Sequence, residues 1–207
     1  HSGDFELQSM IEWASIMFQS RCVEKGLQWE VEGFEVSSVT VRGDEGKLRQ
    51  VLVNLLGNAV KFTPKGKVSL KVTNCENDLY KFEVEDSGVG IDSDALKNIF
   101  KPFRQERTGF QEGGTGLGLA ISQKQVELMN SKLEVESELE IGSKFYFTIL
   151  LPPAQGDVQA STETTKTDVL SLAPGFSVSA LVVDDNSFNR DILNDILTSV
   201  NIEVELA

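Results

Sequence analysis

The chain has 207 residues, of which 40% are hydrophobic and 25% charged, and its formal net charge is −13 at pH 7. These proportions are typical of globular proteins, and the length allows one domain of ordinary size plus part of another. The negative charge opposes nonspecific binding to nucleic acid or anionic lipid. No apolar run approaches the roughly 20 residues that a membrane-spanning helix needs. With only Cys22 and Cys75, the chain is predicted to be reduced and intracellular.

Hydrophobic periodicity predicts an alternation of helices and strands over residues 1–152. In chain order it predicts a helix from residue 7 that Gly26 ends, a strand pair at 27–32 and 39–41, a helix at 44–62, a hairpin at 67–73 and 79–85, a short helix at 93–100, a polar loop at 104–114, a helix at 117–130, and closing strands at 133–137 and 144–151. We therefore expect an α/β layer with the helices on one face of a sheet.

The composition changes after this first domain. Residues 153–177 are rich in Pro, Gly, Gln, Ser and Thr, which favours a flexible linker. Residues 180–183 predict a buried strand that ends in Asp184-Asp185, followed by an amphipathic helix and a second strand at 202–206. A single β-α-β unit is too little for a doubly wound domain, so residues 178–207 are predicted to be a truncated fragment of one.

The helix predicted at 44–62 carries a polar rim beside its apolar stripe. Asn54, Asn58 and Lys61 fall within one narrow sector of the helix surface. An amide oxygen is a ligand suited to Mg²⁺, and Asn58 is our candidate for that role. Lys61 would neutralise phosphate charge, and Phe62 would supply an apolar wall for a base. Taken alone, these residues favour the solvated face of an ordinary amphipathic helix over a binding site.

A second motif, Asp86-Ser87-Gly88-Val89-Gly90-Ile91, follows a predicted strand directly. The carboxylate of Asp86 could accept a hydrogen bond from the exocyclic amine of adenine, and the glycines would let the ring lie against the backbone. The alternative is a simple loop that turns from a strand into a helix.

A third motif, residues 113–119, is rich in glycine and leads into the helix predicted at 117–130. Small residues there expose successive backbone N–H groups, and the helix N-terminus adds partial positive charge that favours phosphate. The Gly-Lys-Ser/Thr of a P-loop does not follow.

The order of these motifs, with Ile99-Phe100-Lys101-Pro102-Phe103-Arg104-Gln105 between the second and third, resembles the catalytic and ATP-binding domain of sensor histidine kinases. This family belongs to the GHKL superfamily and has the Bergerat fold, a two-layer α/β sandwich in which helices cover one face of a mixed sheet. The resemblance covers residues 5–152. Residues 180–207 are similar to the start of a flavodoxin-like response-regulator receiver, in which Asp184 and Asp185 would help bind Mg²⁺. Together the two parts resemble a piece of a hybrid histidine kinase.

The resemblance implies ATP and Mg²⁺ as cofactors and assigns residues from each motif to the site. The expected ATP-binding residues are Asn54, Asn58, Lys61, Phe62, Asp86, Gly88, Gly90, Ile91, Phe103, Gln105, Gly114, Thr115, Gly116, Leu117, Gly118, Leu119 and Ser143. Among them, Asn54, Asn58 and Lys61 are the expected catalytic residues, and Asn58 is the expected Mg²⁺ ligand. Glu140 stands where the last glycine box of the family commonly begins with glycine.

Asn54 separates phosphotransfer from hydrolysis within this superfamily. DNA gyrase and MutL place a glutamate one turn before the metal-binding asparagine, where it activates water as a general base. The amide of Asn54 cannot accept a proton, so we expect slow hydrolysis and transfer of the γ-phosphate to a histidine. A degenerate nucleotide-sensing or partner-docking module and a GHKL ATPase are the alternative hypotheses.

The acceptor histidine is expected outside this chain. His1 is the only histidine, and it precedes Ser2-Gly3 rather than lying in a helical acceptor motif. The resemblance implies dimerisation helices that carry the phosphoacceptor, a homodimer in the full-length protein, and a receiver in cis or a response regulator in trans. We expect no nucleic-acid partner and a cytoplasmic location, which includes the cytoplasmic part of a membrane-anchored sensor.

Overall fold

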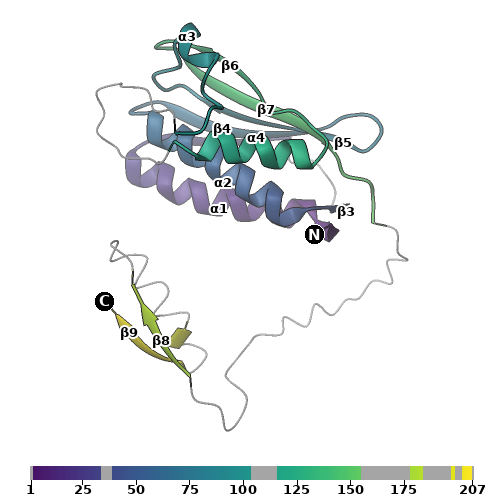
Figure 1. Ribbon diagram of the computed structural model, residues 1–207, viewed down its shortest axis with the longest axis vertical. Helices are drawn as coiled ribbons and strands as arrows, with labels where there is room; N and C mark the ends of the chain where they lie inside the picture. The colour runs from purple at the N-terminus through teal and green to yellow at the C-terminus, as the bar shows by residue number, and fades with distance from the viewer. Residues whose placement is uncertain are drawn as a thin grey trace. The chain divides into compact units, whose positions relative to one another are not determined.

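The computed structural model describes residues 2–33, 39–103, 116–154, 178–183, 197–198 and 202–206 (Figure 1). The chain divides into two units, His1–Gln155 and Gly156–Ala207, and each is described by itself. Among the described residues, no helix is both long enough and apolar enough to cross a membrane.

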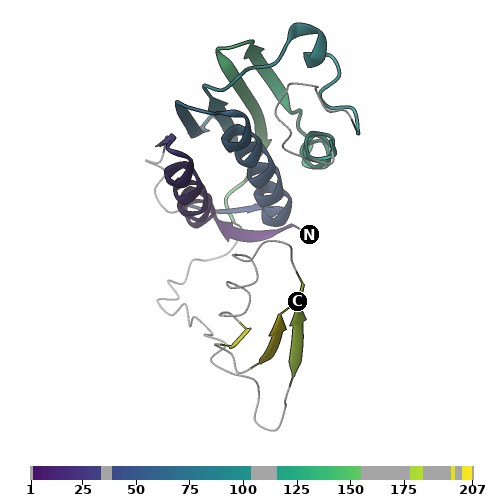
Figure 2. The same cartoon turned by 90° about the vertical axis from the view of Figure 1, so that its left-hand side faces the viewer.

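The first unit is built on a five-stranded mixed sheet. Its strand order is β2 (Gln28–Glu32), β4 (Lys67–Asn74), β5 (Leu79–Asp86), β7 (Gly142–Leu150) and β6 (Glu134–Glu138). The β2–β4 pair is parallel and the other pairs are antiparallel. One face of the sheet is covered by α1 (Leu7–Lys25), α2 (Glu45–Phe62) and α4 (Gly118–Leu128) (Figures 1 and 2). The predicted α/β sandwich with helices on one face is confirmed.

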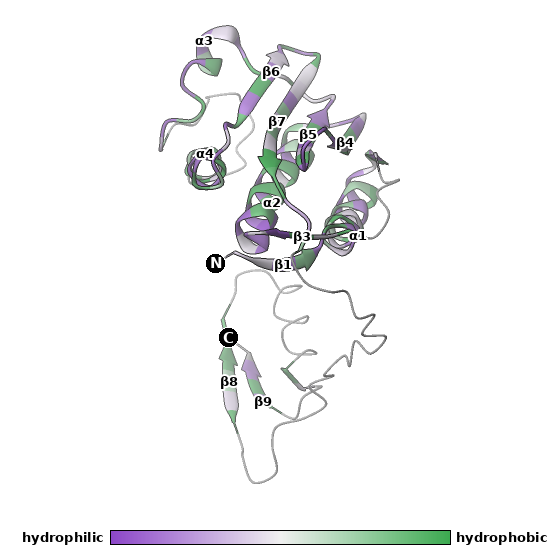
Figure 3. Ribbon diagram, turned by 90° about the vertical axis from the view of Figure 1, so that its right-hand side faces the viewer, coloured by the Kyte–Doolittle hydropathy of each residue, from purple (hydrophilic) through white to green (hydrophobic). Residues whose placement is uncertain are grey.

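The core lies between this sheet and the helices. Hydrophobic and hydrophilic residues alternate along β5 and β7, so one side of each strand faces the helices (Figure 3). Phe82 and Phe147 stack there with ring centroids 5.2 Å apart, and both are buried together with Leu52 and Leu55 of α2. Burial of each such side chain contributes about 1.5–3 kcal/mol, so the core gives α2 a rigid support.

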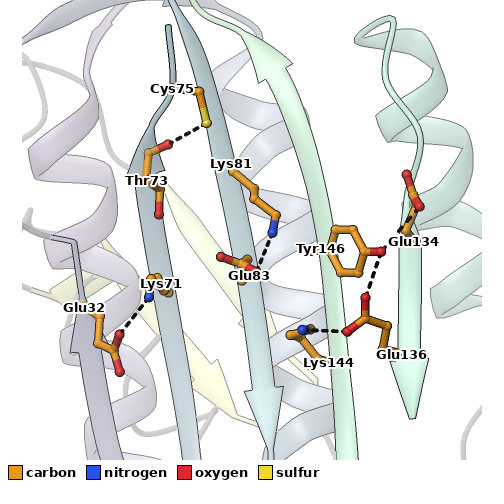
Figure 4. A network of polar contacts seen from close by, with 10 residues as sticks. All are labelled: Glu32, Lys71, Thr73, Cys75, Lys81, Glu83, Glu134, Glu136, Lys144 and Tyr146. Atoms are coloured by element: carbon orange, nitrogen blue, oxygen red, sulfur yellow. Dashed lines mark hydrogen bonds and ion pairs between the residues drawn. The ribbon is translucent and has the colours of Figure 1, made fainter.

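The opposite face of the sheet is polar. Figure 4 shows ion pairs of Lys71 with Glu32, of Lys81 with Glu83 and of Lys144 with Glu136, whose N–O distances are 3.2, 2.7 and 2.6 Å. Exposed ion pairs of this kind contribute little to stability, but they keep one face of the sheet hydrated.

Two sequence predictions on strands and short helices are corrected. The strands predicted at 27–32 and 39–41 do not pair with each other: β2 joins β4, whereas β3 (Thr40–Gly43) pairs with an unpredicted strand, β1 (Gly3–Glu6). In β1 only Phe5 is buried, so its sequence carries no alternating pattern. The helix predicted at 93–100 is confined to α3 (Ser93–Leu96). Beyond it, hydrogen bonds from Asn98 to Ala95 and from Lys101 to Asn98 span three residues, which gives turns instead.

The second unit contains a pair of parallel strands, β8 (Ser179–Val182) and β9 (Glu203–Leu206). The prediction of a fully buried strand at 180–183 is wrong, because Val182 is buried but Leu181 is 62% exposed. Side chains alternate between the two faces of a strand, and one face of this pair lies in solvent. Asp184, Asp185 and residues 155–177 of the predicted linker lie outside the described residues, and of the helix predicted after Asp185 only residues 197–198, which are helical, are described.

Candidate functional site

Helix α2 begins at an N-cap and presents its polar rim at its C-terminal half. The Asp44 carboxylate accepts the backbone N–H of Lys47 at 3.1 Å and pairs with the Lys47 ammonium, which holds the pKa of Asp44 well below its usual range. Asn54, Asn58 and Lys61 are half-buried beside the apolar stripe. The Lys61 ammonium lies 5.3 Å from the centroid of the exposed Phe62 ring.

Helices α2 and α4 run antiparallel in contact with each other. The Asn54 amide donates to the Ser122 hydroxyl at 2.8 Å, and one turn earlier on α2 Gln50 is hydrogen-bonded to Gln125. Since the helices are antiparallel, residues nearer the C-terminal end of α2 face residues nearer the N-terminal end of α4. Asn58, one turn after Asn54, therefore lies toward the N-terminal end of α4. The predicted metal ligand and the predicted phosphate-binding helix end are therefore brought to the same side of the site.

The close approach of these helices depends on Gly118. A Cβ atom on this residue would lie 2.2 Å from Oδ1 of Asn54, well inside van der Waals contact. Glycine at the first position of α4 thus lets Asn54 keep this position against α4, in addition to any approach of a phosphate.

A backbone hydrogen bond joins the segment before α4 to residue 103, which precedes it by 13 positions. The backbone N–H of Phe103 donates to the carbonyl of Gly116 at 3.0 Å, and both residues have left-handed backbone conformations, with φ of 61° and 66°. Phe103 is 76% exposed, whereas Leu119 packs against the core. The first-turn N–H groups of α4 and its dipole favour an anion at this end.

Asp86, at the end of β5, is a buried carboxylate held by neighbours from three elements. Its Oδ1 accepts the backbone N–H of Gly88 at 2.8 Å, and the nearby Thr63 hydroxyl and Ser143 backbone N–H also favour the ionised form. Burial nevertheless raises the pKa of Asp86 to about 6. Asp86 is thus a preorganised acceptor for a donor that enters the site.

The loop after Asp86 is fixed between α2 and the turn from β6 to β7. The Val89 N–H donates to the Phe62 carbonyl at 3.2 Å, and the Glu140 N–H donates to the Val89 carbonyl at 2.7 Å. Cβ atoms on Gly88 and Gly90 would lie 2.3 Å and 1.9 Å from backbone carbonyl oxygens. These glycines therefore let neighbouring backbone segments pack closely, and the predicted approach of an adenine ring to them stays a prediction.

Serine side chains complete this wall of the site. The Ile91 N–H donates to the Ser137 hydroxyl at 2.8 Å, and the hydroxyls of Ser137 and Ser143 lie 3.0 Å apart. Ile91 itself packs against the core. Gly142 has a φ of 139°, and a Cβ there would lie 2.0 Å from the Asp86 carbonyl oxygen. The turn that contains Gly142 thus contacts the Asp86 motif, although Glu140 stands where the family commonly has a glycine.

Sequence reasoning missed Thr63 and Ser137 as site residues. Thr63 directly follows the helix predicted at 44–62, yet it is fully buried and its hydroxyl donates to the Ala59 carbonyl at 2.6 Å. A threonine placed directly after the polar rim was the available signal. The remaining predicted site residues, Gln105, Gly114, Thr115, Asp184 and Asp185, lie outside the described residues.

Comparison with known proteins assigns a family to this arrangement. Residues 43–154 match the family model described as "Histidine kinase-, DNA gyrase B-, and HSP90-like ATPase". The chain is 31% identical to the autoinducer 2 sensor kinase/phosphatase LuxQ of Vibrio vulnificus (strain CMCP6) over 98% of its length and 24% of the relative's. It is 36% identical to the aerobic respiration control sensor protein ArcB of Escherichia coli (strain K12) over 89% and 23% of the two chains.

Solved structures are also similar to this chain. Full-length ShkA in complex with AMPPNP is similar over 100% of this chain and 40% of that chain, with a TM-score of 0.63 and 26% identity. The nucleotide-free catalytic domain of the histidine kinase ThkA is similar over 74% of this chain and 97% of that domain, with a TM-score of 0.62 and 26% identity.

The chain belongs to the family of histidine kinase-, DNA gyrase B- and HSP90-like ATPases. Within that family, its first unit is homologous to the catalytic domains of sensor histidine kinases. The chain spans about a quarter of the length of the curated relatives named above.

Proposed function

We propose that this chain is the ATP-binding catalytic part of a hybrid sensor histidine kinase, which transfers the γ-phosphate of ATP to a histidine on a dimerisation domain. One observation carries the proposal: the antiparallel packing of α2 on α4 brings Asn58 to the anion-favouring end of α4, while Asp86 provides a buried acceptor near Thr63, at the C-terminal end of α2.

The adenine end of the proposed site is formed by Asp86. A carboxylate accepts hydrogen bonds and donates none when ionised, so it selects a base that presents an amine. The Gly88 N–H, the Thr63 hydroxyl and the Ser143 N–H stabilise the ionised form against the cost of burial. The Gly88 bond would hold Asp86 ready for the adenine amine.

The phosphate end is formed by the rim of α2 and the start of α4. Asn58 would hold Mg²⁺ through its amide oxygen, Lys61 would contact phosphate as a point charge, and Phe62 would pack near the nucleotide. When bound, Mg²⁺ would supply charge neutralisation and orientation of the phosphates. The first-turn N–H groups of α4 would donate to phosphate oxygens.

Asn54 supports phosphotransfer over hydrolysis. Its side chain is an amide, which does not take a proton from water, and one of its N–H groups is already donated to Ser122. This partner is a hydroxyl, which at neutral pH is not a general base either. The γ-phosphate would therefore be retained until a protein acceptor arrives.

The second unit is proposed to be the start of a receiver domain. The parallel pairing of β8 with β9 supports this, because a β-α-β unit joins parallel strands. Asp184 and Asp185 would then belong to its Mg²⁺ site. In the full-length protein we propose a homodimer formed through the dimerisation helices, relay of phosphate to a receiver aspartate, and a cytoplasmic position of this part.

The test is a phosphotransfer assay in trans. Radiolabelled γ-phosphate from ATP should appear on the histidine of an added dimerisation-helix fragment taken from the same protein. The fragment with its histidine replaced by alanine should stay unlabelled. Absence of label from the intact fragment, under conditions where the chain binds ATP, would contradict kinase activity while leaving nucleotide binding in place.

A further inference from the structure

We infer that Ser122, a buried residue of α4, is a positioning residue that orients the Asn54 amide at the phosphate end of the site. This inference rests on the proposed function. Ser122 is 2% exposed and lies 68 positions after Asn54 in the chain, yet its hydroxyl accepts a 2.8 Å hydrogen bond from the Asn54 amide.

The contact fixes the direction of the Asn54 side chain. A primary amide has two N–H groups and one oxygen, and its two faces differ in what they can bind. With one N–H on Ser122, Oδ1 lies against Gly118, where a Cβ would approach to 2.2 Å. Ser122 therefore holds the amide in one orientation beside the start of α4, where the phosphates are proposed to bind. Without the Ser122 hydroxyl the amide would rotate more freely, and nucleotide binding would have to order it, which weakens the affinity.

The inference also explains a buried hydroxyl. A polar group that is nearly inaccessible to water costs free energy unless it is hydrogen-bonded, and alanine is the better helix former at an interior position. Ser122 is one of five buried polar or charged residues among those described, and two others, Asp86 and Ser143, line the adenine end. Ser122 is the buried polar residue at the phosphate end.

The inference is tested by a double-mutant cycle on nucleotide affinity. The affinity for Mg-ATP is measured by calorimetry for the unmodified chain, Ser122→Ala, Asn54→Ala and the double variant. Loss of one hydrogen bond predicts that Ser122→Ala weakens binding about 3- to 10-fold in the unmodified background and has no further effect in Asn54→Ala. An equal loss in both backgrounds would show that Ser122 only supports the helix, and would overturn the inference.

Two readouts separate positioning from general support. The affinity for adenosine, which has no phosphate, should be unchanged by Ser122→Ala, and a parallel loss would overturn the inference. Ser131→Ala is the matched control, because the Ser131 hydroxyl also anchors this part of the chain, by donating to the Thr148 carbonyl at 2.6 Å, but follows the C-terminal end of α4, opposite to the end that carries Gly118. It should leave Mg-ATP affinity unchanged.

The outcome remains decisive if Ser122→Ala fails to fold. In the unmodified chain, the side-chain N–H groups of Asn54 should exchange with solvent more slowly than those of the exposed Asn74, as measured by NMR. Equal exchange would contradict the Ser122 contact. If the unmodified chain binds no Mg-ATP, the proposed function is contradicted. If it binds Mg-ATP but Ser122→Ala has the same effect with and without Asn54→Ala, only the role of Ser122 is contradicted.

Discussion

Oδ1 of Asp86 accepts the backbone N–H of Gly88 at 2.8 Å, and this short-range bond holds a carboxylate that is only 8% exposed at the end of a central strand. The loop that begins with these two residues is bonded on one side to the end of α2 and on the other to the turn between β6 and β7. A buried acid placed in this way lowers the stability of the fold and serves binding, which gives the first two predictions.

Asp86→Asn should stabilise the folded chain and weaken ATP binding. The folded-state pKa of about 6 lies above the value of 3.8 for an unperturbed carboxyl, so the fold binds a proton more tightly than the unfolded chain does. The ionised carboxylate lowers the free energy of unfolding. This loss is absent below pH 3.8, grows as the pH rises from 3.8 to about 6, and reaches about 1–3 kcal/mol at neutral pH. Thermal unfolding at neutral pH should show a higher Tm for the variant, while calorimetry shows at least about a tenfold loss of ATP affinity. The exposed Asp78→Asn is the control and should change neither.

ATP affinity should fall as the solution is acidified through pH 6. The adenine amine needs the ionised carboxylate as its acceptor, and protonation of Asp86, whose pKa burial raises to about 6, removes that acceptor. Calorimetric titrations from about pH 8 to about pH 5 should show this loss for the unmodified chain. The Asp86→Asn variant lacks the titrating group, so its weaker binding should change much less over the same range. Parallel pH profiles for the two proteins would rule out Asp86 as the titrating residue.

Asn54→Glu should introduce ATP hydrolysis. A carboxylate at this position lies one turn before Asn58 and can act as a general base toward water, which the amide cannot do. We expect the steady-state rate of phosphate release to rise by about tenfold or more. Asn54→Gln has the same length without the base and should stay at the level of the unmodified chain. Similar rates in the two variants would show that side-chain length, not basicity, sets turnover.

Gly118→Ala should destabilise the packing of α2 against α4. The added Cβ would lie 2.2 Å from Oδ1 of Asn54, so the helices must separate or Asn54 must leave Ser122, at a cost of about 1–3 kcal/mol. Gly57→Ala is the matched helical control, since a Cβ there meets nothing within 4 Å, and it should stabilise the chain by up to about 1 kcal/mol. Chemical denaturation measures both free energies. Equal stability of the two variants would contradict the close contact.

Glu140→Gly should stabilise the turn between β6 and β7. Glu140 has a φ of 64°, a left-handed conformation that costs a residue with a side chain about 1 kcal/mol relative to glycine. Its backbone N–H donates to Val89, so the turn keeps the Asp86 loop in place whichever residue is present. We expect a gain in the free energy of unfolding of about 1 kcal/mol with unchanged ATP affinity. A loss of stability would indicate that the Glu140 side chain itself is needed.

The helices and glycine motifs of the site were predictable because their signals are local. Asp44 as a cap, the apolar stripe of α2 and the glycines after Asp86 each act within a few residues of themselves. The contacts that assemble the site are not local. Asn54 meets Ser122 from 68 positions away, and Ile91 meets Ser137 from 46. Periodicity carries no information on which helix or turn lies opposite.

The strand pairing shows the same limit. The strand at 27–32 was predicted, but its parallel pairing with β4 was not, because the register depends on where α1 and α2 pack. Thr63 was predictable as the residue that ends a helix, but its place near Asp86 was not, since β5 is brought beside it only by the fold.

The most direct test of the central claim is calorimetric titration of the unmodified chain with ATP, with Mg²⁺ present and with Mg²⁺ chelated. The proposed site predicts saturable binding at one site per chain that Mg²⁺ strengthens, because Asn58 and the phosphates share the ion. No saturable binding, or binding of the same strength with and without Mg²⁺, would contradict it.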